Sequence, residues 1–428
     1  MLYLVTERGH RVGKKVNMSS VKKQLNNNAQ RSTTIPKQTY VSTQVIGKAN
    51  LFKKAKPLLP RLDIELTERC NNNCIHCCIN LPLDDFNAKK RELSTEEVKN
   101  ILKEAASLGC LSVRLTGGEP LIREDFQELY IFARRLGLRV LIFTNAILIT
   151  PGLATLFSRI PPLEKIEVTV YGMKKNSYEA VSRVKGSYKN AWRGVNLLLK
   201  NKIPFIVKGA FLPQNKGEVK EFEAWAGANV SWLDGPLEYS MFFNLRNRRD
   251  DAAKDKLIKA LRTSPVEASN QLARRKEGYI KKVKEFCSKF MRPSGDKLFS
   301  CGCGQGGCVD AYGVFQPCLL LRHPDCAYDL KKGSLKEALE DFFPKLRQMK
   351  TVNPEYLERC AKCFLHGLCE QCPARSWLEC QTLDTPVEYL CRVAHEQARF
   401  LGLIGKTENS WEVSDWKNRI NKLVKDNC

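Results

Sequence analysis

Strand-like and helical segments alternate along the chain after residue 60, and this alternation limits the possible folds more than any other feature. The strand-like runs are Leu62–Thr67, Leu111–Thr116, Leu138–Thr144, Lys165–Tyr171, Ile203–Phe211 and Val230–Trp232. Helices between successive strands make neighbouring strands parallel. Six strands are too few to close an eight-stranded barrel, so the pattern predicts an α/β fold built on a partial (βα)6 TIM-like barrel.

Helix boundaries within this stretch carry recognisable capping signals. Ser94 and Glu97 have the spacing of a capping box, and Gly109 and Gly137 stand where the first two helices should end. In a barrel of this kind the loops that follow the strands gather at one rim, where active sites are found. We therefore expect functional residues in the loops after the strands.

Composition divides the rest of the chain. The first sixty residues hold twelve Lys and Arg residues and one Glu, a large part of the formal net charge of +24. Such a polar, basic stretch is typical of a disordered segment. We predict five parts: a mostly disordered basic segment at 1–56, the barrel at 57–247, a charged helical linker at 248–299, a small cysteine-rich domain at 300–400, and a helical tail at 401–428 with a helix at Ser414–Lys425.

Eighteen cysteines without membrane or secretion signals indicate a cytoplasmic metalloprotein. No apolar run is long enough to span a membrane, and the N-terminus lacks the apolar core of a signal peptide. Cytoplasmic thiols stay reduced, so clustered cysteines bind metal more often than they form disulfides. The basic charge permits nucleic-acid binding, but a solvated tail accounts for it better. We expect neither a membrane nor a nucleic acid as a partner.

The loop after the first strand carries three closely spaced thiols, Cys70-Asn-Asn-Asn-Cys74-Ile-His-Cys77. Three thiolates at this spacing can bind three irons of a 4Fe–4S cluster and leave the fourth iron without a protein ligand. A small molecule can bind and be reduced at that open iron. The motif is therefore more typical of a catalytic cluster than of a structural one.

The loop after the second strand reads Leu115-Thr-Gly-Gly-Glu-Pro120. Glycines at a strand end allow the backbone to approach a ligand closely, which applies here to Gly117 and Gly118. The carboxylate of Glu119 can pair with a ligand amine through a charge-assisted hydrogen bond. Alone, this motif is weak evidence for a ligand site. It becomes strong evidence because it follows the three thiols at the end of the next strand.

Together the two loops resemble the radical SAM superfamily, and the resemblance continues through Thr144-Asn145 and Val168–Gly172 to cover roughly residues 57–232. It implies that a 4Fe–4S cluster is bound by Cys70, Cys74 and Cys77. It also implies that S-adenosylmethionine (SAM) occupies the open iron and is positioned by Gly117, Gly118, Glu119, Asn145 and Thr169, with His76 beside the adenine. Catalytic side chains are not identified.

The chemistry implied by the resemblance is reductive cleavage of SAM to a 5′-deoxyadenosyl radical, which abstracts a hydrogen atom from a substrate. The electron comes from an external donor of the flavodoxin or ferredoxin type. One residue departs from the family pattern: Cys78 stands where members often have Tyr. It is interpreted either as an oxidisable thiol near the cluster or as a small buried apolar residue.

A second group of cysteines lies in the C-terminal part of the chain. Its members are Cys301, Cys303, Cys308, Cys318, Cys360, Cys363, Cys369, Cys372 and Cys391. CxxC pairs can form zinc ribbons, but these thiols exceed the needs of one zinc site and His is scarce. The alternative is a set of further iron–sulfur clusters.

These cysteines resemble a SPASM-type domain, the auxiliary-cluster extension of radical SAM enzymes. The resemblance implies two auxiliary 4Fe–4S clusters. One would be bound by Cys360, Cys363, Cys369 and Cys391. The other would be bound by Cys301, Cys318 and Cys372, with Cys303 or Cys308 as its fourth ligand. We expect five cysteines to be unligated: Cys110, Cys287, Cys326, Cys380 and Cys428.

The leading hypothesis for the substrate is a ribosomal peptide or a protein side chain, with other small molecules open. The spacing of two residues between Cys369 and Cys372, where the family commonly has three, also occurs in members that act on tetrapyrroles, which is the alternative. Leu319 stands where sulfatase-maturating members have Asp, which disfavours that activity. The polar N-terminal segment is too short for a recognition domain, so a separate peptide-recognition protein is expected.

Two further interpretations remain from the charge pattern. Arg246, Arg248 and Arg249 are expected to form a solvated charge run, with a substrate entrance as the alternative. The CxxC pairs and the basic charge also permit a non-catalytic, zinc-bearing nucleic-acid-binding protein.

Overall fold

A computed structural model describes residues 59–425 apart from 234–236, 238, 275–278, 281–282, 284–289, 302 and 305. The chain divides into two units, Met1–Ala55 and Lys56–Cys428. The first unit lies outside the described residues, and with it the predicted basic segment 1–56. Cys287 and Cys428 lie outside them too.

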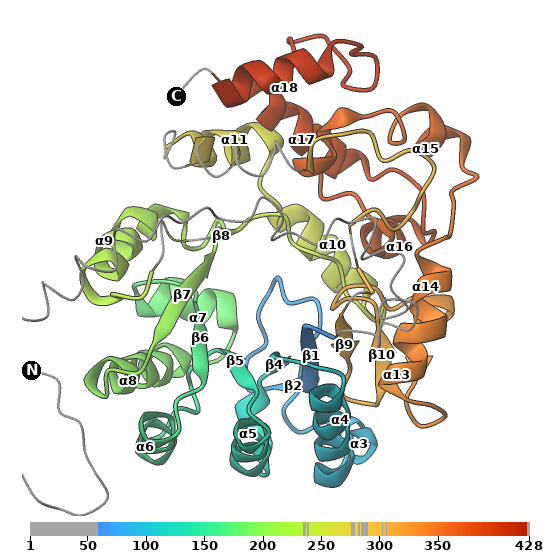
Figure 1. Ribbon diagram of the computed structural model, residues 1–428. Helices are drawn as coiled ribbons and strands as arrows, with labels where there is room; N and C mark the ends of the chain where they lie inside the picture. The colour runs from blue at the N-terminus through green and yellow to red at the C-terminus, as the bar shows by residue number, and fades with distance from the viewer. Residues whose placement is uncertain are drawn as a thin grey trace, which may run out of the picture. The chain divides into compact units, whose positions relative to one another are not determined.

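Six parallel strands form the centre of the second unit and confirm the predicted partial barrel (Figure 1). They are β1 (Arg61–Thr67), β4 (Ser112–Gly117), β5 (Arg139–Thr144), β6 (Leu163–Val170), β7 (Phe205–Ala210) and β8 (Tyr239–Ser240). The sixth strand is a correction, because the predicted run Val230–Trp232 lies at the end of a helix and in the turn after it. A three-residue apolar run cannot distinguish a short strand from a helix end.

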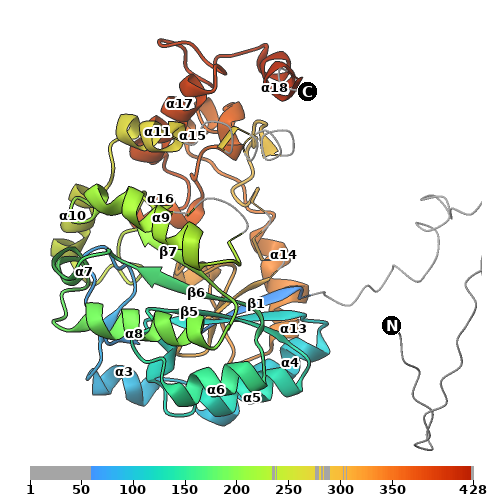
Figure 2. The ribbon, with the colours of Figure 1, turned by 90° about the vertical axis from the view of Figure 1, so that its left-hand side faces the viewer.

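Helices between the strands cover the outer face of the sheet (Figures 1 and 2). They are α4 (Thr95–Ser107), α5 (Phe126–Arg135), α6 (Pro151–Arg159), α7 (Lys175–Ser182), α8 (Ser187–Lys200) and α9 (Val219–Asn229). The predicted capping box opens α4: the Ser94 side chain accepts from the Glu97 N–H, and the Glu97 carboxylate accepts from the Ser94 N–H. Apolar residues of the strands and helices form one core.

The cysteine-rich stretch contributes three strands to the same sheet: β9 (Gly307–Val309), β10 (Val314–Gln316) and β11 (Tyr328–Asp329). β9 pairs with β1 in parallel, with Leu62 opposite Gly307 and Ile64 opposite Val309. The sheet order is therefore β11-β10-β9-β1-β4-β5-β6-β7-β8. The first part of the cysteine-rich stretch is thus built onto the edge of the barrel.

The remaining elements are short helices. The linker holds α10 (Ala252–Leu261) and α11 (Pro265–Ala273), and the cysteine-rich stretch holds α13 (Leu335–Glu337), α14 (Phe343–Leu346), α15 (Pro354–Glu358), α16 (Pro373–Cys380) and α17 (Glu388–Phe400). The predicted tail helix is α18 (Trp416–Lys425). It packs through Ile420 on a small second core that includes Phe364 and Leu403. No helix in the described part of the chain is long and apolar enough to cross a bilayer.

Charged side chains occupy the inner face of the barrel. Since side chains alternate along a strand, buried Leu62, Ile64 and Leu66 face the helices while Asp63 faces inward. Arg114 pairs with Asp63 at 3.0 Å, and Lys208 pairs with Glu167 at 3.0 Å. These pairs fill the interior below the rim.

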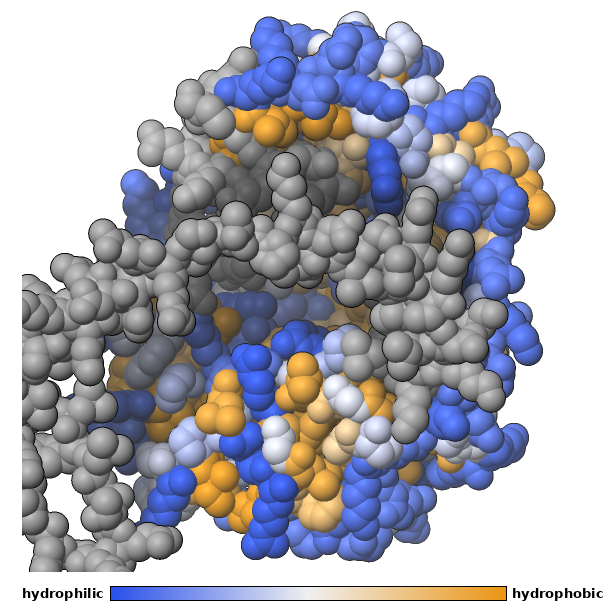
Figure 3. All heavy atoms as spheres, viewed as in Figure 1, coloured by the Kyte–Doolittle hydropathy of each residue, from blue (hydrophilic) through white to orange (hydrophobic). Residues whose placement is uncertain are grey.

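The predicted functional loops lie at only one end of the barrel. Figure 3 looks onto the amino ends of the strands, where hydrophobic residues are scattered among hydrophilic ones. Leu111 and Leu163 are exposed there. The loops with the predicted functional motifs follow the opposite, carboxyl ends.

Candidate active site at the carboxyl ends of the strands

The loop of the three thiols is closed at its base and pinned along its length. β2 (Arg69–Cys70) pairs with β3 (Leu81–Pro82), which brings the two ends of the loop together. Further along, the Asn73 N–H donates to the Ser182 carbonyl at 2.9 Å, and the Ile75 N–H donates to the Val181 carbonyl at 3.0 Å. The carboxyl end of α7 therefore fixes the loop above the barrel.

The three thiols of the loop share one neighbourhood. Burial, and after it the charge of Cys77, raise the pKa of Cys74 to about 12. Burial also raises the pKa of Cys70, and so do the charges of Glu119, Cys77 and Cys74. The Asn72 N–H donates to the Cys70 sulfur at 3.4 Å. Thiols that would repel one another as thiolates are suited to a shared, positively charged partner.

Single-ion sites are absent from the part of the chain that the structure describes. No group of three or more His, Cys, Asp and Glu side chains there is arranged to hold one metal ion. A 4Fe–4S cluster has a different requirement, because each thiolate binds a different iron. The three neighbouring thiols of this loop suit that requirement.

Glu119 lies fully buried at the end of β4, beside the thiol loop. Its carboxylate accepts from the Thr144 hydroxyl and from the Asn145 N–H, both at 2.8 Å, and from the Leu121 N–H at 3.2 Å. Burial raises its pKa to about 7, against these hydrogen bonds. The Asn145 side-chain amide lies 3.8 Å from the Cys70 sulfur. The structure thus brings predicted residues from three loops together.

Gly117 and Gly118 have a second use that the motif did not reveal. A Cβ on Gly117 would lie 2.0 Å from the Thr67 carbonyl oxygen, and one on Gly118 would lie 2.2 Å from the Arg69 carbonyl oxygen. The Gly118 and Glu119 N–H groups donate to the same two carbonyls, at 2.7 and 3.0 Å. The glycines therefore let the two motif loops approach each other.

His76 lies among aromatic rings, and Thr169 lies on β6. The His76 ring is 4.9 Å from that of Phe243 and 5.5 Å from that of Tyr171, centroid to centroid. Burial lowers its pKa to about 4, so the ring is neutral. Thr169 is half-buried on β6 between buried Val168 and Val170, which turns it toward the inside of the barrel.

A cavity of about 720 Å³ extends from the thiol loop toward the C-terminal region. Its lining includes Cys77 and Cys78 at one side and Glu370, Arg375 and Gln397 from the cysteine-rich stretch. Aromatic side chains form the rest of the wall: His76, Tyr171, Phe211, Tyr239, Phe242, Phe243 and Tyr279. The cavity therefore connects the thiol loop with the C-terminal region.

One predicted set of auxiliary ligands converges in the structure. Cys360, Cys363, Cys369 and Cys391 all line one small cavity. Arg359 donates to the Cys391 sulfur at 3.5 Å, and the Leu365 N–H donates to the Cys363 sulfur at 3.4 Å. Such donors stabilise thiolate ligands of a cluster.

The second set gathers around Cys303. A hydrogen bond with Cys301 raises the pKa of Cys303 most, followed by burial. The charges of Cys318 and Cys372 raise that pKa as well. Cys308 lies elsewhere, fully buried on β9. Burial raises its pKa, and the next contribution comes from Glu65 inside the barrel. The structure therefore separates the two candidates for the fourth ligand.

The first arginine of the run after β8 is buried, so the expectation of a solvated run is wrong for this residue. Arg246 is 4% exposed and donates to the Asn80 carbonyl at 3.1 Å. It also pairs with Asp250 at 2.9 Å. Arg248 pairs with buried Glu68 at 2.6 Å. The Asn247 N–H donates to the Cys78 carbonyl at 2.8 Å. This segment fixes the far end of the thiol loop.

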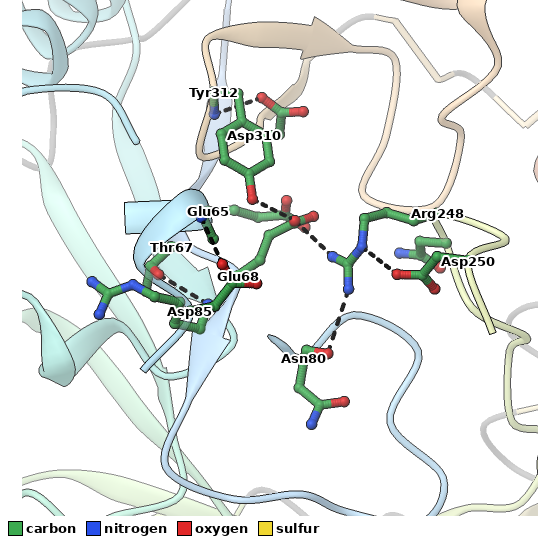
Figure 4. A network of polar contacts seen from close by, with 12 residues as sticks. Glu65, Thr67, Glu68, Asn80, Asp85, Arg248, Asp250, Asp310 and Tyr312 are labelled. Carbon is green, nitrogen blue, oxygen red and sulfur yellow. Dashed lines mark hydrogen bonds and ion pairs between the residues drawn. The ribbon is translucent and has the colours of Figure 1, made fainter. Parts of the chain in front are cut away.

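A polar network that no sequence motif indicated surrounds Glu68 (Figure 4). Arg322 pairs with Glu68 at 2.9 Å and with Glu65 at 2.5 Å. The Tyr312 hydroxyl donates to Glu68 at 2.8 Å. Arg322 and Tyr312 belong to the cysteine-rich stretch, so the network joins that stretch to the start of the thiol loop.

Comparison with known proteins shows what the chain is similar to. Residues 64–226 match the family model of the Radical SAM superfamily. An AdoMet-dependent heme synthase of Methanosarcina barkeri is 27% identical over 333 residues, which cover 73% of this chain and 90% of that protein. A PqqA peptide cyclase of Rhizobium meliloti is 33% identical over 188 residues, covering 42% of this chain and 48% of that protein.

Solved structures show the same fold over most of the chain. Native anSMEcpe with bound AdoMet and Kp18Cys peptide superposes with a TM-score of 0.58 at 16% identity, covering 85% of this chain and 99% of that one. Streptococcus suis SuiB bound to precursor peptide SuiA gives 0.57 at 16% identity, covering 87% and 86%. The fold is that of a radical SAM barrel with a SPASM-type C-terminal extension.

The protein carries a domain of the radical SAM superfamily at residues 64–226. It is an enzyme whose cofactors are SAM and 4Fe–4S clusters. This domain decides against the non-catalytic, zinc-bearing nucleic-acid-binding protein.

Proposed function

We propose that this enzyme removes a hydrogen atom from a side chain of a peptide or protein. The cavity of about 720 Å³ carries the proposal, because it leads from Cys77 to the C-terminal region. Its wall combines aromatic rings with the charges of Glu370 and Arg375 and the amide of Gln397. Such a lining can hold an extended backbone by hydrogen bonds and a side chain by apolar contact.

The chain's own residues would bind and orient the cofactors. Cys70, Cys74 and Cys77 would hold the catalytic cluster, and Glu119 would accept a hydrogen bond from the amino group of SAM. His76 and Thr169 would contact the nucleoside. With the cofactors bound, the site would supply a 5′-deoxyadenosyl radical, and the buried side chains at the rim would limit its contact with water.

Two auxiliary clusters complete the proposal. Cys360, Cys363, Cys369 and Cys391 would bind one, and Cys301, Cys303, Cys318 and Cys372 the other. Support comes from the convergence of each set of thiols. We also propose an external electron donor, a separate peptide-recognition protein and a cytoplasmic location, where thiols stay reduced.

Anaerobic reconstitution followed by a SAM-cleavage assay tests the proposed function. We expect about twelve irons per chain, the content of three 4Fe–4S clusters, and 5′-deoxyadenosine on reduction with dithionite. Candidate peptides encoded near the gene should lose two hydrogens or gain a cross-link in mass spectra. An iron content of about four, or no 5′-deoxyadenosine, would contradict the proposal.

A variant of the cavity wall separates substrate binding from SAM cleavage. Phe242 lines the cavity and is distant in sequence from the three thiols of the Cys70–Cys77 loop. Phe242→Ala should raise the KM for the substrate because it removes an apolar contact. Formation of 5′-deoxyadenosine without substrate should stay unchanged.

A tetrapyrrole substrate is the second candidate. The heme synthase relative, which this chain covers over 90% of its length, favours it, as does the spacing between Cys369 and Cys372. Parallel incubations with porphyrins and with peptides distinguish the two. A substrate-dependent rise in 5′-deoxyadenosine with porphyrin alone would replace the peptide proposal.

A further inference from the structure

A second cavity, of about 750 Å³, lies against the same thiol loop but is lined by different residues. Cys70, Asn73 and Cys74 line it from the loop, and Leu83, Arg183 and Leu257 line it from neighbouring segments. These segments adjoin α3 (Phe86–Arg91), α7 and α10, which lie on one side of the molecule in Figure 2. Of the two cavities, Cys77 lines only the one of about 720 Å³.

Little protein separates the cluster thiols from solvent at this cavity. Asn73 is exposed, while its neighbours Asn72 and Cys74 are buried. Cys70 and Cys74 themselves line the cavity, so no further segment separates them from it. Because the rate of electron transfer falls steeply with distance, a donor that approaches here has a short path to the cluster. Substrate would approach from the other cavity, so the two would not compete for space.

The surface around the cavity has the character of a protein-binding site. Leu83, Phe86 and Leu257 are 49%, 71% and 37% exposed. Neighbouring exposed apolar side chains commonly mark interaction sites. The stretches 81–91, 183–185 and 250–259 hold eight Lys and Arg residues against five Asp. An excess of positive charge favours an acidic partner and speeds its encounter.

We propose that this surface, formed by Leu83, Phe86, Arg183 and Leu257, docks a small acidic one-electron carrier protein that reduces the catalytic cluster. The proposal rests on the proposed function, which places a cluster in the Cys70–Cys77 loop. One electron passes from the reduced carrier to the cluster, and no bond forms or breaks at the surface. Electron-transfer complexes bury little area, under about 1,200 Å², so a small patch suffices.

Charge and polarity changes at the surface test this docking. The variants are Arg183→Glu and the double variant Leu83→Glu with Leu257→Glu. Matched controls are Arg135→Glu on α5 and Val352→Glu, since Arg135 and Val352 are exposed and line neither cavity. The rate of 5′-deoxyadenosine formation is measured with reduced flavodoxin, with reduced ferredoxin, and with two small reductants of opposite charge, dithionite and reduced methyl viologen.

We expect the carrier-driven rates of the surface variants to fall about tenfold, while the rates with both small reductants stay at the wild-type level. The control variants should match wild type throughout. Iron content and melting temperature identify a folding defect. If the double variant does not fold, the single Arg183→Glu variant still tests the docking site.

Three outcomes would decide otherwise. Equal carrier-driven rates in the surface variants and wild type would overturn the docking site. A parallel loss with the small reductants would assign the cavity to SAM or substrate and would also overturn it. If wild type forms no 5′-deoxyadenosine with either small reductant, the proposed function fails instead.

Discussion

The Glu119 carboxylate combines full burial with three hydrogen-bond donors. Burial raises its pKa to about 7, while the bonds from Asn145, Thr144 and Leu121 favour the charged form. A buried carboxylate with a pKa near neutrality is strongly stabilised in its ionised form when a cation binds next to it. Under the proposed function the amino group of SAM would be such a cation, and it would compensate the buried charge of Glu119.

Glu119→Gln is the matching test at this residue. The amide keeps the size of the side chain but removes its charge. Its NH2 group would face the hydrogen-bond donors that now contact the carboxylate. We expect SAM affinity to fall about ten- to a hundredfold, measured by anaerobic equilibrium dialysis. Glu218→Gln is the control, because Glu218 accepts from the Met173 and Lys174 N–H groups at another strand end. Equal affinities would contradict the role of Glu119.

Cys303 and Cys308 make a second pair of contrasting residues. Cys303 lies among the thiols of Cys301, Cys318 and Cys372, whereas Cys308 is enclosed on β9. Cys303→Ser should therefore lose or alter one auxiliary cluster, and Cys308→Ser should keep about twelve irons. Iron analysis and electron paramagnetic resonance of the reduced protein distinguish them. The reverse pattern would make Cys308 the ligand.

At the scale of elements, sequence patterns predicted the longer strands and missed the short ones. β1, β4, β5, β6 and β7 have six to eight residues and fall within two residues of their predicted starts. β8, β9, β10 and β11 have two or three residues, which carry no periodicity of their own. They become strands because a neighbouring strand offers unpaired backbone groups.

Some residues of the site were predicted from the sequence, and others were not. The motifs predicted Cys70, Cys74, Cys77 and Glu119, because each motif is contiguous. Arg322 and Glu65 could not be predicted, since they are 257 positions apart and their pairing leaves no local pattern. The buried role of Arg246 was hidden for the same reason, because its partner Asn80 lies far away in sequence.

The contact between the two motif loops makes a prediction at this scale. Gly118→Ala would place a Cβ 2.2 Å from the Arg69 carbonyl oxygen and 2.5 Å from that of Glu68. The loops must separate, which should cost about 1–3 kcal/mol of stability and most of the SAM-cleavage activity. Gly217→Ala is the control, because no atom lies within 4 Å of its added Cβ. Anaerobic melting curves and 5′-deoxyadenosine assays give both readouts.

Over the whole second unit, the barrel and the cysteine-rich stretch are joined by backbone and by charge. β9 continues the sheet from β1, and Arg322 reaches across to Glu65 and Glu68. Asp310 adds a third carboxylate, 3.7 Å from Arg322. Because this network lies beside the Cys70 loop, it links the position of the three thiols to that of the Cys318 region.

Arg322→Met tests this link. Removing one partner of a buried ion pair leaves uncompensated charge and typically costs about 3–5 kcal/mol. We expect a lower melting temperature of the reconstituted enzyme and earlier cleavage by protease between the barrel and the cysteine-rich stretch. Arg322→Lys should recover part of the loss, because Lys restores the charge but not the two-armed geometry. Arg419→Met is the control, as its pair with Glu408 lies at the surface.

The pH dependence of Arg322→Met gives an independent readout of the same network. Burial raises the pKa of Glu65 to about 7, and Arg322 opposes this rise. A raised carboxyl pKa contributes stability at low pH that is lost as pH rises through the folded-state value. Without Arg322 the pKa rises further, so ionised Glu65 becomes costlier. The melting temperatures of variant and wild type should therefore differ more at about pH 8 than at about pH 6. A constant difference would mean that Arg322 acts through packing, and the barrel and the cysteine-rich stretch would then be held together mainly by the shared sheet.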